Sequence, residues 1–168
     1  MTERLTPKNG KMAKLISLNK FVDSRGWSVN DIYAEAKKAL RFDEFTVSTE
    51  DDKRPFDYQI NYSLIHPGIV KAWHRHKHQD DYFFVLKGMA QVGVYSEEKG
   101  SEKFFIGEHN PALVHISAGE WHGITPLGNE SCGLLYFVTR EYSSHTPDEE
   151  RTTWNDFVGH DWWHPEFK

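Results

Sequence analysis

The chain of 168 residues contains a single cysteine, Cys132. One cysteine cannot form a disulfide within the chain, which favours a reducing compartment, and we expect the protein to be cytoplasmic. No apolar stretch approaches the ~20 residues that a membrane-spanning helix needs. The N-terminal segment is charged and has no apolar core, so we do not expect a secretory signal peptide.

Positive charge is also in short supply. Lys and Arg total 20 against 25 Asp and Glu, which gives a net charge of -5 with histidine neutral. This balance gives no electrostatic basis for binding nucleic acid or an anionic membrane, and we expect neither partner. The length is sufficient for one domain, which we place at residues 13–168, after a flexible N-terminus at residues 1–12.

Helical periodicity is scarce as well. It appears in one short N-terminal segment, where Ser28 is a candidate N-cap and Ile32, Ala36 and Leu40 fall on one face. We expect one short helix there.

Short strands dominate the rest of the chain. Residues 14–22 alternate weakly and predict a first strand, while residues 58–63 and 89–95 alternate clearly. The continuous apolar run at residues 82–86 predicts a strand that is buried on both faces. Strands spaced by ~8–12 residues indicate an all-β sandwich or barrel.

The chain has ten histidines, an unusual number for its length. His74, His76 and His78 occupy alternate positions, so an extended strand would point all three to one face. Asp81 follows shortly after them, and His122 lies in a later segment. Imidazole and carboxylate ligands together suit Mn, Fe, Ni, Cu or Zn. For His78, a solvated loop position is the favoured alternative.

The remaining histidines have no spacing that pairs them with other ligands. We expect surface or capping roles for all of them: His66, His109, His115, His145, His160 and His164. Cys132 is expected to be buried and inert.

Two segments resemble the signature motifs of the cupin barrels. The first runs from Gly68 through His74-x-His76 and Asp81 to Gly88, with Asp81 where glutamate is usual. The second is Gly119-x-x-His122. The resemblance implies an all-β, small jelly-roll barrel. It also implies one divalent transition metal and no organic cofactor. The metal would be held by four side chains: His74, His76, Asp81 and His122.

From about residue 20 onward, the chain resembles the dTDP-4-dehydrorhamnose 3,5-epimerase family of cupins. The similar segments follow the order of that family: residues 23–27, 59–63, 71–74, 119–123, 135–136 and 154–156. The resemblance implies a homodimer that acts on a small-molecule substrate, a nucleotide-linked 4-keto sugar. Protons next to the ketone would be removed and returned on the other face.

The same resemblance assigns roles to individual residues. His74 would be the base and Tyr136 the acid, on opposite walls of the barrel. Four more residues would bind substrate: Arg25, Lys71, Gln59 and Asn61. The family has a lysine near the position of Asp81 that helps to hold the enolate oxygen. A metal bound at Asp81 and the histidines would take over that task as a Lewis acid.

Alternatives remain open at this point. His74 alone can serve as the base without a metal, and Tyr136 can be an ordinary core aromatic. A metal-dependent cupin of another class, such as a dioxygenase or an isomerase of a free sugar, would use the same ligands. A non-catalytic sugar-binding cupin would keep the aromatic residues and not need His74 for binding.

Overall fold

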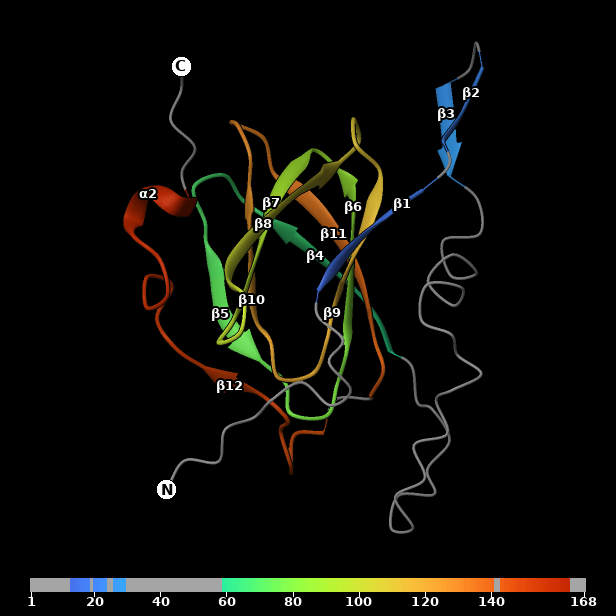
Figure 1. Cartoon of the computed structure of the whole chain (residues 1–168). Coiled ribbons are helices and arrows are strands. Elements are labelled where there is room, and N and C mark those ends of the chain that lie inside the picture. The colour runs from blue at the N-terminus through green and yellow to red at the C-terminus, as the bar shows by residue number, and fades with distance from the viewer. Residues whose placement is uncertain (1–12, 19, 24–25, 30–58, 141–142, 164–168) are drawn as a thin grey trace, which may run out of the picture.

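The computed structural model describes residues 13–18, 20–23, 26–29, 59–140 and 143–163. These residues form two five-stranded antiparallel sheets that face each other as the walls of a barrel (Figure 1). The first sheet contains, in spatial order, β1 (Lys14–Ser17), β9 (Ala112–Ile116), β6 (Asp81–Lys87), β11 (Cys132–Val138) and β4 (Gln59–Ile65). The second contains β12 (Glu150–Arg151), β5 (Lys71–Arg75), β10 (Trp121–Pro126), β7 (Met89–Ser96) and β8 (Gly100–Gly107). The predicted all-β jelly roll is confirmed.

The N-terminal elements differ in detail from the prediction. The expected first strand at residues 14–22 is two strands, β1 and β2 (Lys20–Asp23). β2 pairs with β3 (Gly26–Val29) in a hairpin that stands apart from the two sheets (Figure 1). Ser28 belongs to β3, so the predicted helix does not begin there, and its remaining positions lie outside the described residues. The helix α2 (His160–Trp163), with four residues, is far too short to traverse a bilayer, and the described ranges contain no longer one.

The core lies between the sheets because alternate side chains of each strand point inward. Phe83 and Val85 of β6 meet Val92 and Val94 of β7 in one buried cluster. Burying a side chain of this kind contributes about 1.5–3 kcal/mol. On the other face of β6, Tyr82 and Phe84 join a second cluster, so this strand is buried on both faces as predicted. Leu86 is the exception and is 46% exposed.

The C-terminal segment covers the outer face of the second sheet. Figure 1 shows it passing from β12 to α2 alongside β5. Trp163 is fully buried, and a Cβ at Gly93 would lie 2.5 Å from its ring, so glycine permits this close approach. Gln91 Nε2 donates to the Trp162 carbonyl at 3.0 Å. This docking holds β12 against β5, where Thr152 and Trp73 exchange backbone hydrogen bonds.

The thiol of Cys132 is expected to be unreactive in the native protein. The residue is fully buried at the start of β11, and burial raises its pKa to about 11. Since the thiolate is the nucleophile, a disulfide reagent at about pH 8 should label this thiol only after unfolding. The measurement is thiol titration with and without guanidinium. Rapid labelling of the native chain would contradict the burial of this residue.

Candidate active and metal site

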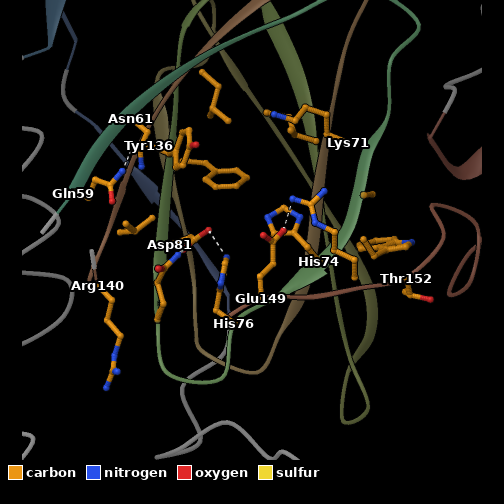
Figure 2. Close-up of a pocket in the computed structure, with 18 of the residues that line it drawn as sticks. Gln59, Asn61, Lys71, His74, His76, Asp81, Tyr136, Arg140, Glu149 and Thr152 are labelled. Atoms are coloured by element: carbon orange, nitrogen blue, oxygen red, sulfur yellow. Dashed lines mark hydrogen bonds and ion pairs between the residues drawn. The ribbon is translucent and has the colours of Figure 1, made fainter. Parts of the chain in front are cut away.

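A cavity of about 530 Å³ opens between the two sheets. β4, β6 and β11 supply its first wall, while β5 and the β12 segment supply the second (Figure 2). Its lining includes most of the residues that the sequence singled out: Gln59, Asn61, Lys71, His74, His76, Asp81 and Tyr136. The two sheets therefore bring together predicted site residues from distant parts of the chain.

Four candidate metal ligands lie close together here; three of them line the cavity, and the fourth, His122, is buried and does not line it. One ligand atom from each of His74, His76, Asp81 and His122 lies within 4.8 Å of the others. His74 is on β5 and pairs in register with His122 on β10. Asp81 begins β6 in the opposite sheet, so the set joins the two walls of the barrel. The alternation of His74 and His76 places both rings on the cavity side, although β5 ends one residue before His76.

Backbone carbonyls fix the orientation of two of these imidazoles. His122 Nδ1 donates to the Glu120 carbonyl at 3.0 Å, and His76 Nδ1 donates to the Asp148 carbonyl at 2.6 Å. A carbonyl can only accept, so Nδ1 carries the hydrogen in both rings. Their Nε2 atoms then face Asp81 Oδ2 at 3.1 Å and 3.7 Å.

This geometry fits a bound cation. Neutral rings with Nδ1–H would direct Nε2 lone pairs at a carboxylate oxygen, which is repulsive unless a proton or a metal ion lies between them. Burial raises the pKa of Asp81, but its hydrogen bond with His122 and the charges of His122 and His76 outweigh that effect and lower it. The carboxylate is thus ionised, as a metal ligand must be.

His74 is held in its neutral form. Burial, followed by the nearby charges of His122 and His76, sets the pKa of His74 well below its usual range. The ring lies 4.1 Å from that of His122, measured between centroids. A neutral imidazole offers a lone pair that can accept a proton from a substrate or bind a metal.

The second cupin-like motif is fixed to the first by a short turn. Gly119 has a φ of +93°, a conformation that favours glycine, and its N–H donates to the His76 carbonyl at 2.7 Å. The buried Glu120 carboxylate accepts N–H groups of Ala13 and Ser117, both at 2.9 Å. Burial raises the pKa of Glu120. These contacts hold the Glu120 carbonyl where it orients His122.

The opposite wall carries the predicted acid and two amides. Tyr136 on β11 lines the cavity and packs against the edge of Phe83, with ring centroids 5.9 Å apart. Gln59 Nε2 donates to Asn61 Oδ1 at 2.7 Å on the neighbouring strand β4. Figure 2 shows Tyr136 and Asn61 across the cavity from His74, with Lys71 at one end.

Some predicted positions lie elsewhere. Arg25 is outside the described residues. His78 is exposed in the loop after β5, in agreement with the solvated loop position favoured for it from the sequence. The surface role expected for His115 is wrong, because this residue is 1% exposed. Its Nε2 lies 2.9 Å from Asp80 Oδ2, and its ring stacks on Tyr82.

Three charged residues of the cavity lining were not predicted to be site residues. Glu149 and Arg151 enter the cavity from the β12 segment and form an ion pair at 2.6 Å. Arg140 follows β11. The available signal was weak, because only the pairing of β12 with β5, some 75 residues away in sequence, brings Glu149 and Arg151 to the site.

Known proteins share this architecture. Residues 42–150, well over half of the chain, match a family described as "Polysaccharide biosynthesis C-terminal domain". The chain is 36% identical to the spore coat polysaccharide biosynthesis protein SpsL of Bacillus subtilis, over 70% of this chain and 84% of that one. It is 38% identical to the probable low-salt glycan biosynthesis epimerase Agl13 of Haloferax volcanii, over 66% of this chain and 78% of that one.

A solved structure confirms the expected fold. The dTDP-6-deoxy-D-glucose-3,5-epimerase RmlC of Legionella pneumophila, in complex with dTDP-4-keto-L-rhamnose, superposes with a TM-score of 0.67. The superposition covers 86% of this chain and 74% of the Legionella chain, and the two sequences are 19% identical. The fold is thus the cupin jelly roll of this epimerase, as the sequence motifs imply. By the extent of the family match and the identity to its relatives, the chain belongs to the polysaccharide biosynthesis C-terminal domain family.

Proposed function

We propose that this chain is a carbohydrate epimerase that acts on a nucleotide-linked 4-keto sugar. Of the four grouped residues, His76, Asp81 and His122 would hold one divalent transition metal, and His74 would stay free to act as the base. The name of Agl13 supports an epimerase, and the dTDP-4-keto-L-rhamnose bound to the Legionella enzyme supports the substrate class. The observation that carries the proposal is the placement of His74 and Tyr136 on opposite sides of one cavity.

Two residues on opposite walls suit a proton transfer that inverts a carbon. His74 accepts the proton from the carbon next to the ketone, and the electron pair of that C–H bond passes into the enolate. The Tyr136 hydroxyl then returns a proton to the same carbon from the other face. A phenol hydroxyl is a hydrogen-bond donor and can supply the proton that this step requires.

The enolate oxygen needs positive charge nearby. When bound, a divalent ion held by these residues would supply a Lewis acid for that oxygen. Imidazole and carboxylate ligands together suit Mn, Fe, Ni, Cu or Zn, and the proposal includes no organic cofactor.

The substrate's phosphates require cations at the cavity. Lys71, Arg140 and Arg151 all line it. Guanidinium groups match phosphate oxygens in a bidentate manner, which an ammonium group cannot do. Gln59 and Asn61 offer amide groups to the sugar hydroxyls from the wall that also carries Tyr136.

The proposal extends to a cytoplasmic homodimer. Ile60, Tyr62 and Leu64 on the outward face of β4 are 70%, 57% and 52% exposed. Within the described residues β4 pairs with β11 alone, so one of its edges is open. An exposed apolar stripe on an edge strand is typical of a surface that pairs with another chain.

The direct test is hydrogen exchange in deuterated water. We expect the metal-loaded protein to replace the protons next to the ketone of a 4-keto nucleotide sugar with deuterium, followed by NMR, and to form an epimer. Failure to exchange any such proton with dTDP- and UDP-linked 4-keto sugars would reject the proposed reaction.

Replacing Tyr136 with phenylalanine should strongly impair this exchange. The variant keeps the ring that packs on Phe83 but loses the hydroxyl that returns the proton. A general acid contributes about 10²–10⁴-fold, so deuterium incorporation at the inverted carbon should fall by that factor. Tyr62→Phe is the matched control, because Tyr62 is exposed on the outer face of β4. If Tyr136→Phe exchanges deuterium at the wild-type rate, Tyr136 is not the acid and only packs in the barrel.

A further inference from the structure

Asp148 contacts three successive residues of the loop that carries His76. Its Oδ1 accepts the Lys77 N–H and its Oδ2 accepts the His78 N–H, both at 2.9 Å. Its backbone carbonyl accepts the His76 Nδ1–H at 2.6 Å. No sequence motif singles out this residue, and it lies at least 70 positions from each of its partners.

The loop needs this support because β5 ends at Arg75. Beyond that residue the chain leaves the second sheet, and the N–H groups of Lys77 and His78 have no strand partner. β12 pairs with β5 as far as Glu150 opposite Arg75, which places Asp148 just past the end of the ladder. Asp148 thus replaces the missing sheet hydrogen bonds with a carboxylate.

The same residue determines how the His76 ring is presented. The His76 side chain is 13% exposed, so burial alone does not fix the orientation of its ring. The bond to the Asp148 carbonyl keeps the hydrogen on Nδ1 and leaves the Nε2 lone pair facing Asp81, 3.7 Å from Oδ2. A histidine ligand whose other nitrogen is held in this way has a fixed tautomer and a fixed orientation.

We propose that Asp148 is a positioning residue for His76, which fixes its tautomer and thereby tightens metal binding. This inference rests on the proposed metal site. It assigns to the β12 segment a task beyond lining the cavity, since residue 148 links that segment to the ligand set.

A simple loop-capping role is the alternative, and the chain offers a matched control for it. Asp156, in the same C-terminal segment, accepts the Thr153 N–H at 3.2 Å and the hydroxyls of Thr152 and Thr153. It is fully exposed and does not line the cavity. Asp156→Ala removes a cap of the same kind without touching the histidines.

The test compares Asp148→Ala, Asp148→Asn and Asp156→Ala with the wild-type full chain. The first readout is the His76 tautomer in metal-free protein, from NMR of the imidazole nitrogens. The second is the dissociation constant for Zn²⁺, from competition with a chelating dye. We expect wild type to hold the Nδ1–H form. Asp148→Ala keeps the carbonyl of residue 148 but loses the carboxylate that holds the Lys77 and His78 N–H groups, so the loop is no longer fixed against that carbonyl. This variant should show mixed tautomers and bind Zn²⁺ about 10–100-fold more weakly.

The other two variants sharpen the result. Asp148→Asn should be intermediate, because its amide oxygen can accept one of the two N–H groups, and it serves as the test if the alanine variant does not fold. Asp156→Ala should match wild type in both readouts. The proposal is overturned if the Asp148 variants keep the wild-type His76 tautomer and Zn²⁺ affinity. It is also overturned if Asp156→Ala changes the tautomer and the Zn²⁺ affinity as much as Asp148→Ala does. If wild type takes up no metal, the metal site of the proposed function fails, and the tautomer comparison still decides the role of Asp148.

Discussion

Replacing His74 with alanine is expected to reduce turnover of a nucleotide-linked 4-keto sugar by at least about 10²–10⁴-fold, while the fold survives. The side chain is held neutral by burial and faces the cavity rather than the apolar core. Its loss therefore removes a reactive lone pair with little loss of packing. Initial rates of deuterium exchange give the effect, and circular dichroism checks the fold.

Metal content separates the two roles open to His74. A variant that keeps its metal but loses exchange would identify His74 as the base. A variant that loses both would identify it as a ligand. His66→Ala is the control, because His66 is exposed and its ring contacts Ser131 away from the cavity. A His74→Ala enzyme with wild-type turnover would contradict both assignments.

Replacing Trp163 with alanine should have the largest effect on stability. This side chain is fully buried, and it packs over Gly93 and 4.9 Å from Trp73 between ring centroids. Truncating a buried tryptophan costs about 3–5 kcal/mol, a large fraction of the stability of a small domain. The loss should also loosen β12 and with it the cavity residues Glu149 and Arg151.

Urea denaturation measures this change directly. Phe105→Ala is the comparison, since Phe105 is 45% exposed on β8 and its truncation should cost far less. If Trp163→Ala and Phe105→Ala unfold at the same urea concentration, the C-terminal segment does not stabilise the barrel in the way described.

The site histidines were predictable because they lie in local patterns. His74 lies on β5 and His76 just beyond its end, at alternate positions. The turn before His122 requires a positive φ, which Gly119 can adopt. Period-2 patterns also predicted the central strands, because alternation directly reflects which face is buried. The convergence of the four candidate ligands on one point followed from the cupin resemblance, not from the spacing alone.

The missed features depend on contacts between distant segments. Asp148, Glu149 and Arg151 reach the site only because β12 pairs with β5. Nothing local distinguishes Asp148 from other acids in a polar stretch. His115 looked like a surface histidine because its partner, Asp80, lies 35 positions away in sequence, just before β6. Long-range pairings of this kind have no short sequence signature.

The measurement that tests the central claim most directly is deuterium exchange at the sugar carbon by one protein preparation in two states. The first state is stripped of metal by a chelator, and the second is reloaded with one equivalent of a divalent transition metal. We predict exchange next to the ketone in the reloaded protein and its loss in the stripped protein, with both folded by circular dichroism. Equal exchange in both states would show that His74 acts without a metal, and would contradict the metal-assisted reaction proposed for this site.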